Sequence, residues 1–349
     1  MLLRMKNTRY ELYSCLWELT LKCNLNCMHC GSVAGSAKLQ ELTLSECYRI
    51  ADEIIDLNCK ELTLIGGEIF LYSGWEKVAG YLSKRGIMVN IITNGYRVDK
   101  KEIDQIKYAN LTNVGVSIDG NELIHNLIRR NKHSFEHIRK TLDLLNLADI
   151  PIGVITSLIE MNYPEMEPVY QFLIQNNVKV WQIQLVNPMG NMAGKNDLIL
   201  DRKHIPSLID FIREKNKDRK ILVLAADNIG YYYDDSESYI RGASSPFCFW
   251  QGCQAGLSTV FIDSTGNVKG CGALYADTFI EGNLKKNSLA EIWNNQDNFS
   301  YNRKFKTELL EGGCRDCDIG DVCKGGCRAS DYFNTGSLYE NAFCAHRIN

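Results

Sequence analysis

Short strand-like segments alternate with amphipathic helical segments through the first two thirds of this 349-residue chain. Strands that are joined through helices lie parallel, so six such units predict an α/β fold with a parallel sheet and helices packed outside it. The periodicity alone does not separate an open doubly wound sheet from a partial barrel, and ligands bind at the carboxyl ends of the strands in both. The expected strands cover residues 15–20, 62–65, 89–93, 114–118, 152–158 and 178–186, and the helical segments include 44–57, 75–84, 134–148 and 165–176.

The composition is that of a globular protein with room for one large domain and a smaller one. Apolar residues make up 45% of the chain and charged residues 23%, and the formal net charge is −3. This balance gives no reason to expect binding to nucleic acid or to an anionic membrane. Residues 1–10 lack the apolar core of a signal peptide, and no later segment is apolar enough to span a bilayer. We therefore expect a cytoplasmic protein.

Three cysteines follow the first expected strand with the spacing C-x3-C-x2-C: Cys23, Cys27 and Cys30. Three thiolates on one loop can ligate three irons of a 4Fe–4S cluster and leave the fourth iron open to a small molecule. Zinc sites need four ligands, commonly from two cysteine pairs, and no second pair lies nearby. His29 is another candidate ligand, but it lies within the tight second spacing. The triad therefore predicts a cluster with an open iron, and zinc is the alternative.

A second motif, Gly66-Gly67-Glu68, follows the expected strand at 62–65. Glycines let a ligand approach the backbone closely, and a carboxylate at the end of a strand can meet an ammonium group. Together the triad and this motif resemble the signature of the radical S-adenosylmethionine (radical SAM) superfamily. The resemblance implies a six-stranded partial (β/α)6 barrel, similar to part of a TIM barrel, with SAM bound at the open iron. It also implies that the Gly-Gly-Glu motif holds the amino group of the methionine moiety.

The same resemblance suggests further SAM contacts. Family members carry a motif near the ribose after the fourth strand, and an arginine near the SAM carboxylate follows it. In this chain these positions correspond to Ser117, Asp119 and Arg129, although structural turns use the first two residue types equally well. Gln184 and Asn187, at the end of the sixth strand, could face the same site or have solvated or structural roles.

From residue 248 onward the chain is rich in turns and glycines, and it contains eight of the fourteen cysteines. Residues 260–262 and 268–270 predict a hairpin, and 289–293 predict a short helix. The order C-x12-G-x4-C, then C-x2-C-x5-C-x3-C and a final cysteine, resembles the SPASM extension of radical SAM enzymes. The resemblance implies a small cysteine-rich α+β domain at 248–349, after a barrel at 1–215 and a bridging region at 216–247.

Complete SPASM domains carry two auxiliary 4Fe–4S clusters, and the resemblance assigns four cysteines to each. We therefore expect three 4Fe–4S clusters, one of which binds SAM. Cys15, Cys47 and Cys59 remain, and a buried cysteine is usually a small apolar packing residue. Two structural zinc sites are the alternative, because C-x2-C also suits zinc. The two implied sets are Cys248, Cys253, Cys271 and Cys327, and Cys314, Cys317, Cys323 and Cys344.

The resemblance implies reductive cleavage of SAM to a 5′-deoxyadenosyl radical, which removes a hydrogen atom from the substrate. Auxiliary clusters that are fully ligated by cysteine would carry an electron away, which implies a net two-electron oxidation. Sulfatase maturases place an aspartate after the cysteine that corresponds to Cys271, whereas this chain has Gly272, so we do not expect formylglycine formation. Residues 252–256, 263–268 and 281–284 resemble stretches of maturases of ribosomally made peptides (RiPPs). We predict an oxidoreductase that modifies a precursor peptide, with a thioether or carbon–carbon crosslink as the favoured product.

Two other enzymatic functions stay open: a SAM-dependent dehydrogenase of a small alcohol or sugar, and a peptide epimerase. A pure electron carrier or a zinc-structured binding module does not explain the open triad together with Gly-Gly-Glu. The expected partners are a precursor peptide and a flavodoxin- or ferredoxin-type reductant. Because the cluster motif begins at residue 23, we expect a leader peptide to need a separate leader-binding protein or direct docking on the barrel.

Overall fold

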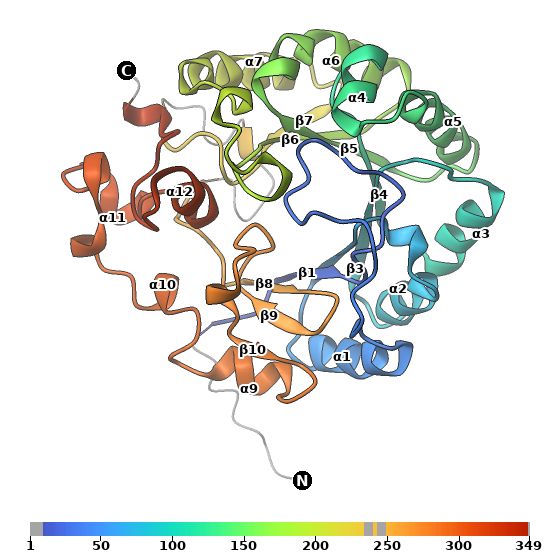
Figure 1. Cartoon of the computed structure of the whole chain (residues 1–349), viewed down its shortest axis with the longest axis horizontal. Helices are drawn as coiled ribbons and strands as arrows, with labels where there is room; N and C mark the ends of the chain where they lie inside the picture. The colour runs from blue at the N-terminus through green and yellow to red at the C-terminus, as the bar shows by residue number, and fades with distance from the viewer. Residues whose placement is uncertain (1–9, 234–239, 243–248, 348–349) are drawn as a thin grey trace.

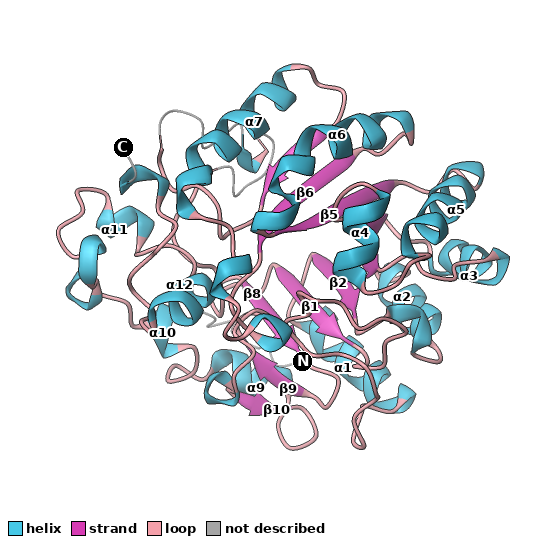
Figure 2. Ribbon diagram, turned by 45° about the horizontal axis from the view of Figure 1, so that its top comes forward, coloured by secondary structure: helices cyan, strands magenta, loops and turns pink. Residues whose placement is uncertain are grey.

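A computed structural model describes residues 10–233, 240–242 and 249–347. Its centre is one sheet with the strand order β10-β9-β8-β1-β2-β3-β4-β5-β6-β7, and helices cover the outside of the curved sheet (Figures 1 and 2). Strands β1 to β7 pair in parallel with their neighbours, and β7 and β10 remain at the edges, so the barrel does not close. The predicted partial barrel is therefore confirmed. The strands are β1 (Ser14–Glu18), β2 (Glu61–Ile65), β3 (Met88–Thr93), β4 (Asn113–Ser117), β5 (Ile152–Leu158), β6 (Val180–Leu185), β7 (Leu222–Ala225), β8 (Thr259–Ile262), β9 (Asn267–Lys269) and β10 (Gly282–Asn283).

The helices follow the amphipathic pattern of the sequence and turn their apolar sides to the sheet. Helix α1 begins at a capping box, in which Thr43 and Glu46 each accept a hydrogen bond from the other's backbone N–H. The α-helices are α1 (Leu44–Asp56), α2 (Trp75–Ser83), α3 (Lys100–Ala109), α4 (Glu122–Arg129), α5 (Ser134–Leu147), α6 (Met166–Gln175), α7 (Ile205–Lys217), α9 (Leu289–Asn294), α10 (Ser300–Arg303), α11 (Gly320–Cys323) and α12 (Arg328–Thr335). The short 3-10 helices are η1 (Ile69–Leu71), η2 (Glu160–Glu165), η3 (Gly190–Met192), η4 (Asn196–Leu198), η5 (Arg202–His204), η6 (Asp277–Phe279), η7 (Thr307–Leu309), η8 (Gly312–Cys314) and η9 (Ala345–Arg347).

The hydrophobic core lies between the sheet and its helices. Trp17 of β1 and Trp181 of β6 are fully buried. The three cysteines outside the predicted ligand sets, Cys15, Cys47 and Cys59, are buried as well, so they pack as apolar residues as expected.

The cysteine-rich part shares the sheet of the barrel. The predicted hairpin is confirmed as β8 and β9, and the predicted short helix is confirmed as α9. The sequence did not predict that β8 pairs in parallel with β1, in the register Ser14↔Thr259. A further strand, β7, lies within the expected bridging region and extends the other edge. The cysteines that follow β8 are therefore fixed beside the first barrel strand, while the domain boundaries proposed above stay predictions.

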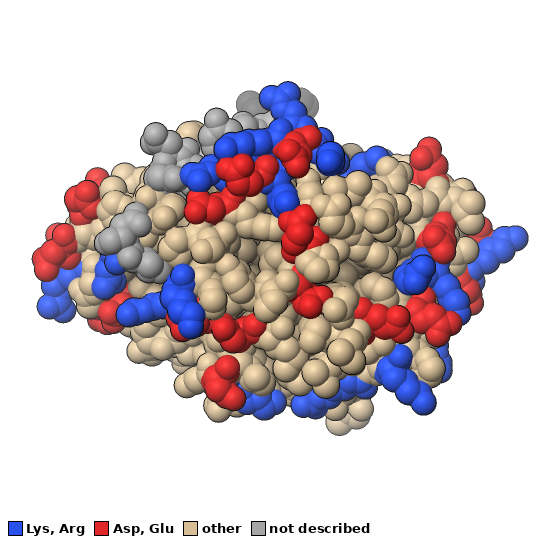
Figure 3. All heavy atoms as spheres, turned by 90° about the horizontal axis from the view of Figure 1, so that it is seen from above, with Lys and Arg blue, Asp and Glu red and all other residues tan. Residues whose placement is uncertain are grey.

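The surface carries charges of both signs. Figure 3 shows one face on which Lys and Arg are interspersed with Asp and Glu, without a large area of a single sign. Such a face has no strong field to attract a polyanion. In the part of the chain that the structure describes, no helix combines the length and apolarity needed to cross a membrane.

Candidate functional site

The cysteine triad lies on a loop that leaves the carboxyl end of β1. The backbone of this loop closes on itself, because Cys23 N–H donates to the carbonyl of Gly35 at 2.9 Å, and Gly35 N–H donates to that of Leu21 at 2.9 Å. Burial raises the pKa of Cys23, and the thiols of Cys27 and Cys30 raise it further, because the three sulfurs lie within electrostatic reach of one another. The structure thus brings the predicted triad together at the mouth of the barrel.

Each sulfur of the triad has a nearby hydrogen-bond donor. Leu25 N–H donates to Cys23 Sγ at 3.5 Å, Ala34 N–H donates to Cys30 Sγ at 3.4 Å, and Arg129 Nη1 donates to Cys27 Sγ at 3.8 Å. Burial raises the pKa of Cys23 to about 11, which a bound metal would reverse. Donors of this kind stabilise thiolates and tune cluster potentials. The donor set fits an iron–sulfur cluster with three protein ligands.

The Gly-Gly-Glu motif packs tightly against this loop. A Cβ on Gly67 would lie 2.6 Å from the carbonyl oxygen of Lys22, which explains why glycine stands there. The carboxylate of Glu68 is buried and accepts hydrogen bonds from Thr93 Oγ1 at 2.7 Å and from Asn94 N–H at 2.8 Å. The motif therefore ties the end of β2 to the cluster loop and to the end of β3, and its contact with SAM stays a prediction.

Asp119 and Arg129 form a buried ion pair beneath the cluster loop. Arg129 Nε donates to Asp119 Oδ2 at 2.7 Å, and His29 Nε2 lies 2.9 Å from the same oxygen. Although burial opposes ionisation, the charges of Arg129 and His29 hold the pKa of Asp119 well below its usual range. Burial and the nearby Arg129 charge lower the pKa of His125, behind this pair, to about 3. In this structure Asp119 and Arg129 hold the loop in place.

Replacing Asp119 with asparagine should destabilise the fold. Asparagine keeps the shape but leaves the buried Arg129 without a counter-ion, which typically costs about 3–5 kcal/mol. Urea unfolding of the reconstituted protein measures the loss. The matched control is Asp104→Asn on the exposed side of α3, which should change the free energy of unfolding by less than about 0.5 kcal/mol. Equal stability of the two variants would contradict a supporting role for the ion pair.

A cavity of about 320 Å³ lies beside the cluster loop, between the strand ends and the cysteine-rich part. Its lining includes Gly66 from the end of β2, and Gln184 and Asn187 from β6 and the loop after it. Gln184 and Asn187 thus face the site, which was one of the two roles considered for them from the sequence. The cavity is lined from the other side by Gly272, Ala273 and Tyr275, which follow the hairpin that begins with β8, the strand paired with β1. Ser117, Asp119 and Arg129 are not among the lining residues.

The cavity contains a carboxyl group that the sequence analysis did not single out. Glu18, the last residue of β1, lines the cavity and is only 2% exposed. Within the described ranges its carboxylate accepts one long hydrogen bond, from Ser264 N–H at 3.4 Å, and burial raises its pKa to about 7. Tyr275 and Asn187 also line the cavity, and Tyr275 Oη and Asn187 Oδ1 are buried without a partner in the described structure. Its position at the carboxyl end of the first strand could have identified Glu18 in the sequence, because residues at strand ends line the sites of such barrels.

The structure gathers the cysteines of the C-terminal part into two groups. The pKa of Cys327 is raised by burial and by the thiols of Cys253 and Cys271, which therefore lie close to it. Cys248, the predicted fourth member of this set, lies outside the described residues. The second group lines one enclosed pocket and consists of Cys314, Cys317, Cys323 and Cys344.

Four convergent thiols fit a cysteine-ligated cluster. Asp318 and His346 lie beside Cys317, with His346 Nε2 at 3.0 Å from Asp318 Oδ1, and could form a mixed metal site with it. Such a site would use only one of the four thiols. Ligation by the complete group therefore stays our prediction.

Comparisons with known proteins agree with this arrangement. The sequence profile of the radical SAM superfamily matches residues 17–173, and that of an iron–sulfur cluster-binding domain, SPASM, matches residues 253–318. The first range begins in β1 and ends in α6, and the second begins at the cysteine before β8. Each profile therefore covers part of the cavity lining, the first from Glu18 to Ser157 and the second from Phe261 to Tyr275.

Two kinds of curated relative align along most of the chain. An AdoMet-dependent heme synthase from Methanosarcina barkeri is 28% identical over an alignment of 343 positions that covers 95% of each chain. A mycofactocin maturase, MftC, from Mycolicibacterium smegmatis is 27% identical over 319 residues, 91% of this chain and 78% of that one. Among solved structures, Streptococcus suis SuiB bound to S-adenosylmethionine superposes with a TM-score of 0.75 at 14% identity, over 95% of this chain and 76% of SuiB.

These matches, the open parallel barrel and the cysteine loop at its mouth define the family. The chain therefore carries a domain of the radical SAM superfamily over residues 17–173 and a C-terminal SPASM iron–sulfur cluster-binding domain over residues 253–318.

Proposed function

We propose that this enzyme oxidatively modifies a peptide substrate, with a thioether or carbon–carbon crosslink as the product. The chemistry of the cavity lining carries this proposal. Gln184 and Asn187 supply neutral amides, which pair well with the N–H and C=O groups of a peptide backbone, whereas the amide of Asn228 is already bonded to the backbone of Leu185. The similarity to the mycofactocin maturases supports the same substrate class.

The residues that would hold the cofactors follow from the site. Cys23, Cys27 and Cys30 would ligate the SAM-binding 4Fe–4S cluster, and the two C-terminal groups of cysteines would ligate auxiliary clusters. When bound, these cofactors supply a 5′-deoxyadenosyl radical that takes a hydrogen atom and an oxidised cluster that takes one electron. A flavodoxin- or ferredoxin-type protein would provide the reducing electron, and a separate leader-binding protein could present the peptide.

Glu18 accepts the proton that a two-electron oxidation releases. Loss of a hydrogen atom and an electron leaves the substrate one proton in excess, and a base must remove it. Glu18 is the only carboxylate among the described residues that line the cavity. Tyr275, whose buried hydroxyl has no partner among the described residues, orients the substrate beside it.

A second candidate is an enzyme that acts on a tetrapyrrole. The observation in its favour is the similarity to the AdoMet-dependent heme synthases over nearly the whole of both chains. Tetrapyrroles carry carboxylates, and buried carboxylates need cationic partners. Among the described residues that line the cavity, none is Lys or Arg, and Glu18 would repel a carboxylate. We therefore place the peptide substrate first.

One anaerobic experiment separates the candidates. The protein is reconstituted with iron and sulfide, reduced, and supplied with SAM and synthetic peptides encoded beside its gene, and 5′-deoxyadenosine and peptide mass are followed together. A peptide lighter by about two hydrogens supports oxidative crosslinking. An unchanged mass with solvent deuterium at one carbon indicates epimerisation. Stimulation of SAM cleavage by an iron porphyrin carboxylate but by no peptide favours the tetrapyrrole candidate, and stimulation by a small alcohol or sugar indicates a dehydrogenase.

Product formation should depend on the ionisation of Glu18. Because its pKa is raised to about 7, the carboxyl is mainly protonated at pH 6 and mainly ionised at pH 8. Only the ionised form accepts a proton, so kcat should fall about tenfold per pH unit below the pKa and reach a plateau above it. Among the nearby charges, Asp263 raises this pKa and Lys38 lowers it, and the Lys269 ammonium also interacts with Glu18. A flat profile between pH 6 and 8, with the chemical step rate-limiting, would contradict the assignment.

A further inference from the structure

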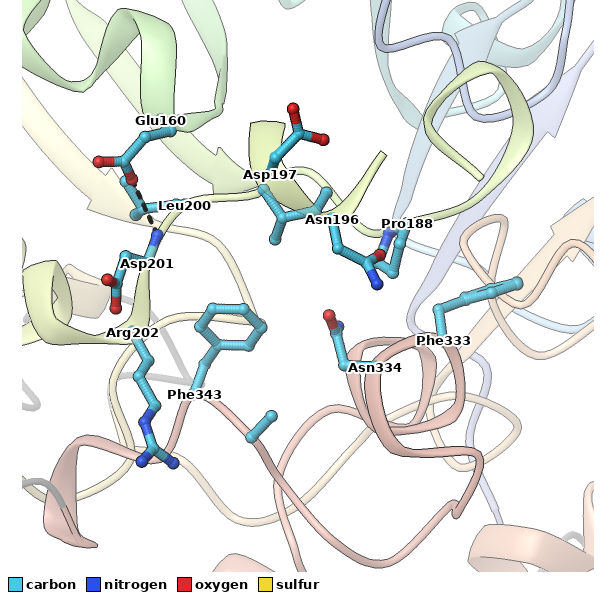
Figure 4. A pocket seen from close by; sticks show the side chains of 12 residues that line it. Glu160, Pro188, Asn196, Asp197, Leu200, Asp201, Arg202, Phe333, Asn334 and Phe343 are labelled. Atoms are coloured by element: carbon cyan, nitrogen blue, oxygen red, sulfur yellow. Dashed lines mark hydrogen bonds between the residues drawn. The ribbon is translucent and has the colours of Figure 1, made fainter. Parts of the chain in front are cut away.

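A second hollow, of about 580 Å³, lies between the loop after β6 and the cysteine-rich part. One wall is the segment that contains η4 and η5, and the other is formed by α12 and the residues before η9. In Figure 4 the side chains of Asn334 and Phe343 rise from the cysteine-rich part toward the segment that carries Asn196 and Asp197. This groove, defined by its lining of residues 160, 188, 196–197, 199–202, 333–334 and 342–343, is built jointly by the barrel and the cysteine-rich part.

The groove has an apolar floor and an acidic rim. Leu200 and Phe343 are buried in the floor, and Phe333 adds a half-buried aromatic side chain. Three of the four ionisable lining residues are acidic: Glu160, Asp197 and Asp201 are opposed only by Arg202. A peptide segment that presents apolar side chains and cationic groups complements such a surface.

The acidic rim is only partly neutralised by the chain itself. Asp201 pairs with Lys203 Nζ at 2.9 Å, and Glu160 Oε1 lies 3.2 Å from His204 Nε2. Asp197 is exposed and has no ion-pair partner within the described ranges. It is therefore the carboxylate that remains available to a ligand.

The groove adjoins the cavity that contains Glu18. Pro188 lines the groove, whereas its two neighbours Asn187 and Met189 line the cavity. One short loop thus separates the two spaces. An extended chain advances about 3.3–3.6 Å per residue, so a few residues suffice to pass from one space to the other.

We propose that this groove binds a cationic, apolar segment that flanks the modified residue of the substrate peptide. The assignment rests on the proposed function. It specifies where the enzyme binds the flanking segment of its substrate and which side chains of that segment it prefers. Affinity would come from the apolar floor, and charge selection would come from Asp197. An acidic segment would meet the same carboxylates and be excluded, because like charges across an interface repel.

Fluorescence anisotropy with the reconstituted protein tests the assignment. The probes are a fluorescein-labelled twelve-residue peptide in which Lys alternates with Leu and Phe, and a copy with Glu in place of every Lys. The wild type should bind the Lys peptide and not the Glu copy. Asp197→Lys should weaken binding of the Lys peptide about tenfold or more, and should bind the Glu copy more tightly than the wild type does. Phe333→Ala should weaken binding of the Lys peptide through the lost apolar contact.

The control variant is Asp104→Lys, which makes the same charge change on the exposed side of α3 and should bind both peptides as the wild type does. A wild type that binds both probes equally or neither would overturn the assignment, as would equal effects of Asp197→Lys and Asp104→Lys. If Asp197→Lys binds the Lys peptide as the wild type does, and a substrate peptide is still modified, the groove assignment is wrong but the proposed function stands. If no peptide stimulates SAM cleavage by the wild type, the proposed function is wrong, irrespective of how the two probe peptides bind.

Discussion

Replacing Cys27 with alanine is expected to abolish reductive cleavage of SAM. Cys27 is buried on the loop after β1, and its thiol is one of only three that this loop offers. A cluster with two protein ligands would be lost, so iron content should fall from about twelve to about eight atoms per chain if all three sites hold 4Fe–4S clusters. Quantification of 5′-deoxyadenosine, together with iron and sulfide analysis, measures both effects.

The matched control is Cys47→Ala, because Cys47 is also buried but packs in α1 beside the hydroxyl of Tyr72. This variant should retain its iron and its SAM cleavage. Retained cleavage in Cys27→Ala would overturn the assignment of the triad. Loss of all iron from Cys27→Ala would instead show that the C-terminal cysteines do not hold clusters independently.

Replacing Glu18 with glutamine is expected to uncouple SAM cleavage from product formation. Glutamine fills the same space but cannot accept a proton, so product formation should fall by about 100-fold or more. SAM cleavage depends on the triad and should continue, which raises the ratio of 5′-deoxyadenosine to product. The substrate radical, which can no longer lose its proton as it gives up an electron, should also accumulate, and electron paramagnetic resonance of frozen samples detects this radical.

Glu61→Gln is the control, because Glu61 lies at the amino end of β2, away from the cavity, and accepts a hydrogen bond from Asn90 Nδ2 at 3.0 Å that glutamine can keep. Infrared difference spectra of the wild type and Glu18→Gln supply a readout that does not need turnover. The carboxylic acid band that the substitution removes should titrate near pH 7. Normal coupling in Glu18→Gln would show that another group takes the proton.

The sequence motif identified Asp119 and Arg129 but not the groups to which they bond. The resemblance identified both residues as SAM contacts, and they do lie beside the cluster loop. Their charged groups, however, bond to each other, to His29 and to Cys27. A motif fixes which residues approach a site, but hydrogen-bond partners depend on side-chain geometry that spacing does not encode. Contact of either residue with SAM stays a prediction.

Glu18 is the opposite case, a residue of the cavity that no sequence motif identified. In the sequence Glu18 is one carboxylate in a short strand, and no motif around it marks it as functional. Its burial, and hence its raised pKa, depends on Ser264 and Tyr275, which lie about 250 residues away and arrive through the pairing of β8 with β1. Only that pairing turns a strand-end carboxylate into a group that can exchange protons near neutral pH.

The sequence alone determined the parallel α/β sheet, the cluster loop and the cysteine-rich hairpin. Each of these depends on local spacing: the alternation of strand and helix, three thiols within eight residues, and a turn between two short strands. The tertiary structure decided the register of β8 on β1, the buried Glu18, the network around Asp119 and the groove between the barrel and α12. These features join segments far apart in the chain, and the packing that brings them together is set by the whole core rather than by any local pattern.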